Sequence, residues 1–322
     1  MNDLKQYANV FEGITPWSGR VPRGYLVDFL GTLTDARFDV ISDLDPACVG
    51  GDVVTTTVRA VSDGELWFEA VNWVVAAREA RGRYTMVTLG ACYGAQAVGS
   101  YRALQQLNPM PAKLVAVEPE PDNFDWIARH MRDNGIDPER QWLLRYAISD
   151  RNDVVYFPVG SPGSGAQNCF ATNERAAREF YVQELLARDD IKGSLRNLLL
   201  RNTTGLSKDL VPGTRFKGEI KLMSAITLKD VLSPFDVVDY VESDIQQSEI
   251  VVFPPYIDLL RKKVRRIHIG THGVEVHKAL HEQFEKNGWT IVFSYEPNAC
   301  FSTELGDFST NDGVLTVRNP DL

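Results

Sequence analysis

The sequence predicts an α/β protein built on a mostly parallel sheet with helices on both faces. Three observations carry this prediction. Short apolar segments, typical of buried strands, alternate with segments whose apolar residues recur at helical spacing. The chain has 322 residues, of which 44% are hydrophobic and 24% charged, which is enough for one large domain with appended segments. It shows no internal repeat or low-complexity tract that would indicate a solenoid.

The first strand and helix units are expected in the first half of the chain. A helix over residues 67–75 precedes a strand at residues 86–89. A second strand, at residues 113–117, leads into a helix whose apolar stripe runs over residues 124–131. A third strand is expected at residues 142–146. Strands that alternate with helices in this way form parallel sheets.

The regular pattern is interrupted at both ends of this region. Residues 161–218 lack clear alternation and are expected to form an insertion or lid, with a helix over residues 174–188. Residues 1–65 are expected to be an N-terminal extension with short strands at residues 25–32 and 53–58. The main domain would then cover residues 66–322.

After the insertion the alternation resumes and gives the rest of the sheet. The expected elements are strands at residues 237–241 and 264–269, a helix at residues 278–286, and strands at residues 290–294 and 314–317. No helix is evident between the last two strands, so they are expected to be antiparallel at the edge of the sheet.

Composition excludes several classes of protein. A net charge of −9 argues against binding to nucleic acid, and the basic run that begins at Lys262 is short. No apolar stretch approaches the ~18 residues of a membrane span, so no membrane insertion and a cytoplasmic location are expected. The four cysteines show no paired spacing, which favours reduced thiols. The sequence is compatible with a homo-oligomer.

A ligand site is predicted at the carboxyl ends of the first two strands. Gly90 and Gly94 follow the first strand with the spacing GxxxG, which differs from the GxGxxG of dinucleotide enzymes and disfavours a dehydrogenase. Glu118 follows the second strand, where a carboxylate can accept hydrogen bonds from both hydroxyls of a ribose. This combination predicts a nucleoside-containing cofactor.

Several motifs, taken together, carry a family resemblance. They are VTLGACYG, VAVEPEPDNF, RYAISD, DYVESDIQQSE, RRIHIGTHG and DGVLTVRNP. In this order they resemble the FkbM family of S-adenosylmethionine-dependent methyltransferases, from about Tyr84 to the C-terminus. The resemblance implies a Rossmann-like class I methyltransferase fold, with a seven-stranded, mostly parallel sheet and an antiparallel C-terminal edge strand. It also implies S-adenosylmethionine as cofactor and methylation of a hydroxyl on a sugar, glycan or other small natural product.

The resemblance also implies which residues bind the cofactor. They come from the glycine loop, the end of the second strand, the segment after the third strand and the end of the fourth. The set is Thr88, Gly90, Ala91, Gly94, Glu118, Pro119, Asn123, Ala147, Ile148, Asp150 and Asp244. The chain departs from the family at Thr88, where an acid is usual, and at Gln247 and Gly270. These departures motivate a second hypothesis, a catalytically silent scaffold or partner-binding protein that keeps the fold.

Candidate catalytic residues follow the fourth and fifth strands. Transfer of a methyl group to a hydroxyl requires an aligned acceptor and a base that removes its proton. We predict His272 as the base, Asp244 as the residue that orients the acceptor or cofactor, and Glu249 as a supporting residue. The alternatives are a hydrogen-bonding role in the turn for His272 and a helix cap for Asp244. Four of the five histidines lie close together in sequence, but their spacing matches no metal motif and no metal is predicted.

Overall fold

The sheet confirms the predicted α/β fold. The structure is a computed structural model that describes residues 4–38, 49–159, 219–246 and 248–322, so the predicted insertion and its helix at residues 174–188 lie outside the described residues. The central sheet has seven strands in the order β13-β16-β12-β11-β5-β6-β7. These strands are β5 (Tyr84–Leu89), β6 (Ala112–Val117), β7 (Trp142–Leu144), β11 (Val238–Ser243), β12 (Val264–Thr271), β13 (Thr290–Tyr295) and β16 (Gly313–Arg318).

The C-terminal strand β16 is antiparallel, as predicted, but its position in the sheet differs from the expectation. It lies between β12 and β13 and is antiparallel to both, so β13 forms the edge of the sheet. The burial of the two strands agrees with this order. Five of the six residues of β16 are buried, whereas β13 begins with an exposed residue. The strand that is paired on both sides is the more buried of the two.

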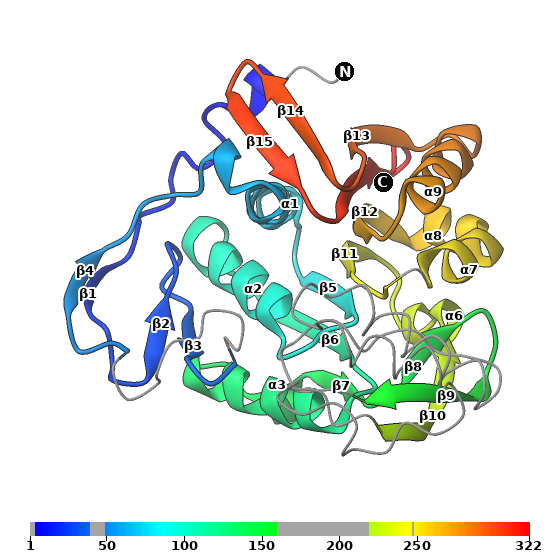
Figure 1. The fold of residues 1–322 in the computed structure, drawn as a ribbon, viewed down its shortest axis with the longest axis horizontal. Coiled ribbons are helices and arrows are strands. Elements are labelled where there is room, and N and C mark those ends of the chain that lie inside the picture. Colours follow the sequence, from blue (N-terminus) through cyan, green and yellow to red (C-terminus); the bar gives the residue numbers. More distant parts are fainter. Residues whose placement is uncertain (1–3, 39–48, 160–218, 247) are drawn as a thin grey trace, which may run out of the picture.

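Helices cover both faces of the sheet, which runs from β13 at the top of Figure 1 to β7 at the bottom. One face carries α1 (Glu65–Glu79), α2 (Ala95–Leu107) and α3 (Pro121–Asp133), and the other carries α6 (Leu228–Leu232), α7 (Glu249–Val252), α8 (Ile257–Lys263) and α9 (Val274–Lys286). Side chains of β5 alternate between the two cores: Met86 packs toward α1 and α2, and Val87 packs toward the helices of the opposite face. Every residue of β5 is therefore buried.

A second, small sheet lies beside the end of β7, at the lower right of Figure 1. It contains β8 (Ala147–Ser149), β9 (Asp153–Val159) and β10 (Glu219–Thr227), in the order β8-β10-β9. The predicted strand at residues 142–146 therefore ends at Leu144, and the chain enters the second sheet three residues later.

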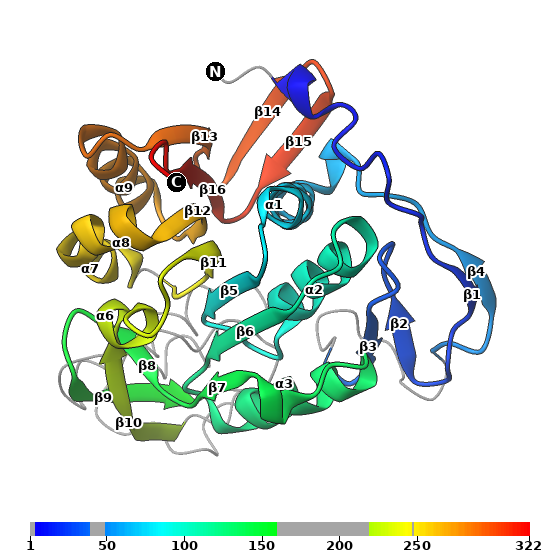
Figure 2. The same ribbon diagram turned by 180° about the vertical axis from the view of Figure 1, so that it is seen from behind.

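The N-terminal residues pack along α2 and α3 (Figure 2). They form two short pairs, β1 (Ser18–Arg20) with β4 (Val53–Thr55) and β2 (Tyr25–Val27) with β3 (Leu33–Asp35). The predicted strand at residues 25–32 is therefore wrong in length, because the chain turns after β2. The Asp28 carboxylate accepts the N–H groups of Leu30 and Thr32 and closes this turn.

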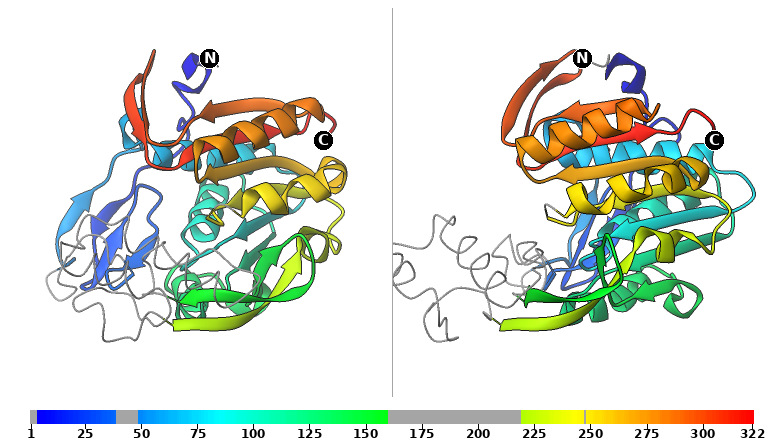
Figure 3. Two further views of the ribbon diagram at one scale, coloured as in Figure 1. Left: turned by 45° about the vertical axis from the view of Figure 1, so that its right-hand side comes forward. Right: turned by 90° about the vertical axis from the view of Figure 1, so that its right-hand side faces the viewer.

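The hairpin of β14 (Ala299–Thr303) and β15 (Gly306–Thr310) was not predicted. It stands above the sheet in both views of Figure 3, and Phe308 packs on Phe68 of α1 with ring centroids 5.1 Å apart. Short 3-10 turns complete the described chain at Leu4–Tyr7, Val61–Asp63, Pro138–Arg140 and Pro254–Tyr256. Among the described residues, no helix is both long and apolar enough to cross a membrane.

Candidate functional site

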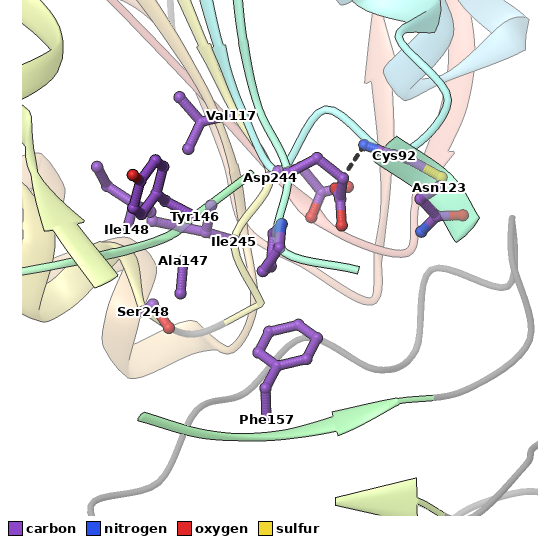
Figure 4. Close-up of a pocket in the computed structure, with 13 residues that line it drawn as sticks. Cys92, Val117, Asn123, Tyr146, Ala147, Ile148, Phe157, Asp244, Ile245 and Ser248 are labelled. Atoms are coloured by element: carbon purple, nitrogen blue, oxygen red, sulfur yellow. Dashed lines mark hydrogen bonds between the residues drawn. The ribbon is translucent and has the colours of Figure 1, made fainter. Parts of the chain in front are cut away.

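A cavity opens at the carboxyl ends of β5, β6 and β11, where ligands bind in open α/β sheets (Figure 4). Its walls come from the loops after these three strands, from β8 and from β9. The lining residues are Gly90, Cys92, Val117, Glu118, Pro119, Asn123, Tyr146, Ala147, Ile148, Phe157, Asp244, Ile245 and Ser248.

The loop after β5 approaches the loop after β11 closely at Gly90. Gly90 has a φ of +73°, and a Cβ at this position would lie 1.8 Å from the backbone oxygen of Asp244. The N–H groups of Gly90 and Ala91 both donate to the oxygen of Val117 at 3.0 Å. Two residues beyond Gly90, Cys92 has a φ of 47° without being glycine. Such backbone strain is common at ligand-binding loops.

Glu118 directly follows β6 and lines the cavity. Its Oε2 accepts the N–H of Cys92 and its Oε1 accepts the N–H of Glu120, each at 2.8 Å. Burial raises the pKa of this carboxyl to about 8, with the two N–H groups acting in the opposite direction. The oxygens retain lone pairs that can accept hydroxyl donors from a ligand.

Apolar side chains from the small sheet line another part of the cavity. Ala147 and Ile148 come from β8, and Phe157 of β9 faces them across the cavity (Figure 4). The side chains are suited to the flat face of a heterocycle. Asp150, predicted to lie near an adenine, is not among the lining residues; its Oδ1 accepts the Ser149 hydroxyl at 3.1 Å.

His272 lies beside Asp244 within a cluster of carboxylates. Its Nδ1 is 3.1 Å from Glu249 Oε1, and its Nε2 is 3.3 Å from Asp244 Oδ1 and 3.4 Å from Asp312 Oδ1. Burial lowers the pKa of this imidazole, but the nearby carboxylates of Asp312, Glu249 and Asp244 outweigh burial and raise it to about 11. The imidazole is therefore positively charged at neutral pH.

Two of the three carboxylates around the His272 ring differ in their exposure. Glu249 is fully buried, and its Oε1 also accepts the N–H of Ile245 at 3.1 Å. The Asp244 side chain is 54% exposed. Partial burial and the negative charges of Asp312 and Glu249 raise the pKa of Asp244 to about 6, against the positive charge of His272. Asp244 is therefore the member of the cluster that both lines the cavity and titrates near neutral pH.

Asp312, a residue that sequence reasoning missed, is held in place by α1. Glu65, in the first turn of this helix, accepts the N–H groups of Asn311 at 2.5 Å and Asp312 at 2.9 Å through one carboxylate oxygen. The loop before β16 is thereby fixed next to His272. No local motif marks Asp312, because its partner is far away in sequence.

The structure brings seven of the predicted site residues together in the cavity: Gly90, Glu118, Pro119, Asn123, Ala147, Ile148 and Asp244. Ala91 and Gly94 belong to the same loop but do not line the cavity, and Gly94 is the N-cap residue of α2. Thr88 is buried within β5, and its hydroxyl has no hydrogen-bond partner among the described residues. Tyr146 and Ser248 also line the cavity; both lie within the quoted motifs but were not predicted as site residues, and Phe157 lies outside every motif.

The other three histidines that lie close together in sequence bond to hydroxyl groups. His268 is buried with its Nδ1 2.7 Å from the Thr316 hydroxyl, and His277 and His281 both contact the Ser294 hydroxyl. Burial lowers the pKa of His268 to about 3 and that of His277 to about 4. Within the described ranges, no group of three or more His, Cys, Asp or Glu side chains is arranged to hold a metal ion.

Comparison with known proteins gives one curated relative and several distant structures. No family model matches the chain. The sequence is 23% identical over 258 residues to a protein of Jannaschia sp. (strain CCS1) named "Putative methyltransferase", covering 79% of this chain and 80% of that protein. This chain resembles a protein named as a methyltransferase.

Two solved structures illustrate the distant likenesses. The precorrin-6y C5,15-methyltransferase of Geobacter metallireducens GS-15 superimposes with a TM-score of 0.39 at 9% identity, covering 81% of this chain and 92% of that one. The methyltransferase FkbM of Methylobacillus flagellatus KT has a TM-score of 0.38 at 10% identity, covering 81% of this chain and 55% of that one.

Proposed function

We propose that the protein is an S-adenosylmethionine-dependent methyltransferase that methylates a hydroxyl of a sugar, glycan or other small natural product. The observation that carries the proposal is the convergence of the Gly90 loop, Glu118 and the apolar wall of β8 on one cavity at the carboxyl edge of the sheet. The curated relative supports methyl transfer through its name, and the sequence motifs support the FkbM family.

The cavity contains groups that fit each part of the cofactor. The Glu118 oxygens can accept the two ribose hydroxyls, and the wall of Ala147, Ile148 and Phe157 can hold the adenine. Asp244 places negative charge near the Gly90 loop, which suits a cationic sulfonium. The bound cofactor would supply an electrophilic methyl group for an in-line displacement.

The base is assigned to Asp244 in this proposal. The sequence predicts His272 for that role, but an imidazole that is protonated on both nitrogens at neutral pH has no free lone pair to accept another proton. The Asp244 carboxylate, half-exposed in the cavity, can accept the acceptor's hydroxyl proton. His272 then orients Asp244 and stabilises its negative charge, and Glu249 fixes the imidazole ring.

Isothermal titration calorimetry with S-adenosylmethionine and S-adenosylhomocysteine tests the cofactor site. Glu118→Gln is expected to weaken binding at least tenfold, or about 1.4 kcal/mol, because the amide offers fewer acceptor sites to the ribose. Glu139→Gln, whose side chain is 87% exposed, serves as the matched control. Affinity of the wild type should rise between pH 6 and 8, as Glu118 ionises.

The outcomes separate the two hypotheses for this fold. Absence of binding of either nucleoside to the wild type would contradict the proposal. Binding that is accompanied by no release of S-adenosylhomocysteine with any hydroxylated acceptor would favour the silent scaffold instead.

A further inference from the structure

A second cavity, of about 320 Å³, lies within the N-terminal extension. Its walls come from the β2–β3 hairpin, from the segment after β4 and from Tyr93. The volume falls in the range of small-molecule sites, roughly 300–1,000 Å³. Nothing in the cofactor site described above uses these residues, except that Tyr93 belongs to the same loop as Gly90 and Cys92.

This second cavity is a neighbour of the candidate active site. Tyr93 lines it directly after Cys92, which lines the cofactor cavity. Arg59, on its rim, is close enough to Asp28 and to Glu69 of α1 for its positive charge to lower the pKa of each carboxyl. The negative charge of Asp244 in turn raises the pKa of Glu69. The loop that leads into α2 therefore lines both cavities.

The lining of the second cavity combines hydroxyl groups with an aromatic ring. Thr34 and Thr57 offer hydroxyls that can donate or accept, and Arg59 offers guanidinium donors. The Tyr93 ring stacks on Phe38 with centroids 5.0 Å apart and planes 13° apart, which holds it in place. The Tyr93 side chain, an apolar ring with a polar hydroxyl, suits a ligand with one apolar face and polar edges.

The charges of the residues that line the second cavity disfavour a phosphate-containing ligand. Arg59 is the one basic residue and Asp28 the one acidic residue among those that line the cavity, and the Asp28 carboxylate already accepts two backbone N–H groups. Phosphate recognition typically uses several Arg or Lys side chains or a helix N-terminus. The lining therefore favours a neutral polyhydroxylated ligand.

We propose that this cavity is an acceptor subsite that holds a pyranose ring, so that the N-terminal extension recognises the acceptor beside the cofactor site. The hydroxyls of the sugar would bond to Thr34, Thr57 and Arg59, and one face of the ring would lie on Tyr93. This inference rests on the proposed function for its biological meaning, since it names the class of acceptor.

Saturation-transfer NMR on the full chain, saturated with S-adenosylhomocysteine, tests the subsite. The probes are the methyl α-pyranosides of glucose, mannose and galactose. At least one is expected to receive saturation on its ring protons. Thr57→Val and Arg59→Met should each weaken its Kd by about two- to tenfold, the effect of losing one hydrogen bond. Thr55→Val is the matched control, because Thr55 bonds to Ser18 and does not line the cavity.

The results distinguish this inference from the proposed function. No transfer to any of the three pyranosides, or equal affinity for Thr57→Val and Thr55→Val, would overturn the subsite. Calorimetry with S-adenosylhomocysteine on the same variants should give unchanged cofactor affinity. A wild type that binds a pyranoside through Thr57 but no sulfur nucleoside, with the NMR then run without the nucleoside, would uphold the subsite and refute the methyltransferase.

Discussion

The imidazole of His272 is enclosed by three carboxylates, and its neighbours fix its protonation state over the physiological pH range. The sequence placed His272, Asp244 and Glu249 near one another, because the ends of adjacent parallel strands meet at one edge of a sheet. It did not indicate Asp312, which arrives from a loop at the far end of the chain. That third carboxylate is what changes the chemical role expected of the histidine.

Replacement of His272 by Asn is expected to lower the free energy of unfolding by about 3–5 kcal/mol, because it leaves the buried Glu249 without its ion partner. Since the folded pKa is raised to about 11, the stability contributed by His272 is full below about pH 6.5, the unfolded value. It is lost as the pH rises toward 11. Urea unfolding of both proteins between pH 6 and 11 measures this loss.

The matched variant for this experiment is His281→Asn, which removes a half-buried imidazole bonded to Ser294. Its effect on stability should be smaller. A His272→Asn effect that stays constant from pH 6 to 11 would show that the imidazole is uncharged in the folded protein.

The loops after β5 and β11 contact each other closely at Gly90. Gly90→Ala places a Cβ against the Asp244 backbone and also requires a φ that costs an L-residue about 1–2 kcal/mol. We expect the variant to unfold at a markedly lower temperature than the wild type and to lose S-adenosylhomocysteine binding, because the two loops must separate.

Gly135→Ala separates these two effects in the same assay. Gly135 has the same φ of +73°, but nothing lies within 4 Å of a Cβ at that position. Its cost should be limited to the backbone term of about 1–2 kcal/mol. Equal thermal shifts for the two variants would exclude the steric contact as the reason for glycine at position 90.

Helices and strands with a clear hydrophobic period within their own residues were predictable from the sequence. The strands β5, β6 and β12 and the helices α1, α3 and α9 each carry their own hydrophobic period, and all lie where that period indicated. The small sheet of β8, β9 and β10 was not predictable, because Ala147 pairs with Ala225 across the long segment between β9 and β10. Phe157 enters the cavity from this sheet, so its role in the site was equally hidden.

At the scale of the whole molecule, the N-terminal residues and the main domain share one core. Leu4, Phe29 and Leu30 belong to the same buried cluster as Trp67 and Phe68 of α1. The Tyr7 ring lies 4.9 Å from Phe293 of β13. Residues 1–65 are therefore an extension in topology only. We expect them to unfold together with the main domain in one transition.

Leu30→Ala is expected to lower the free energy of unfolding of the whole chain by about 2–5 kcal/mol, because it leaves a cavity in this shared core. Leu66→Ala, at a position 47% exposed, should cost much less. Calorimetric unfolding of the wild type should show a single transition that Leu30→Ala shifts as a unit. Two transitions, of which only one moves, would show that the extension unfolds independently.

The place of β16 between β12 and β13 has a consequence for the order in which this protein can fold. Among the described strands, β13 pairs with β16 alone, so it cannot join the sheet before residues 313–318 are available. Until then β12 is an open edge, and Asp312 is not yet beside His272. During synthesis on the ribosome, the sheet and the charged cluster are therefore completed in the same late step, which favours a slow closing phase and an exposed strand that a chaperone could shield.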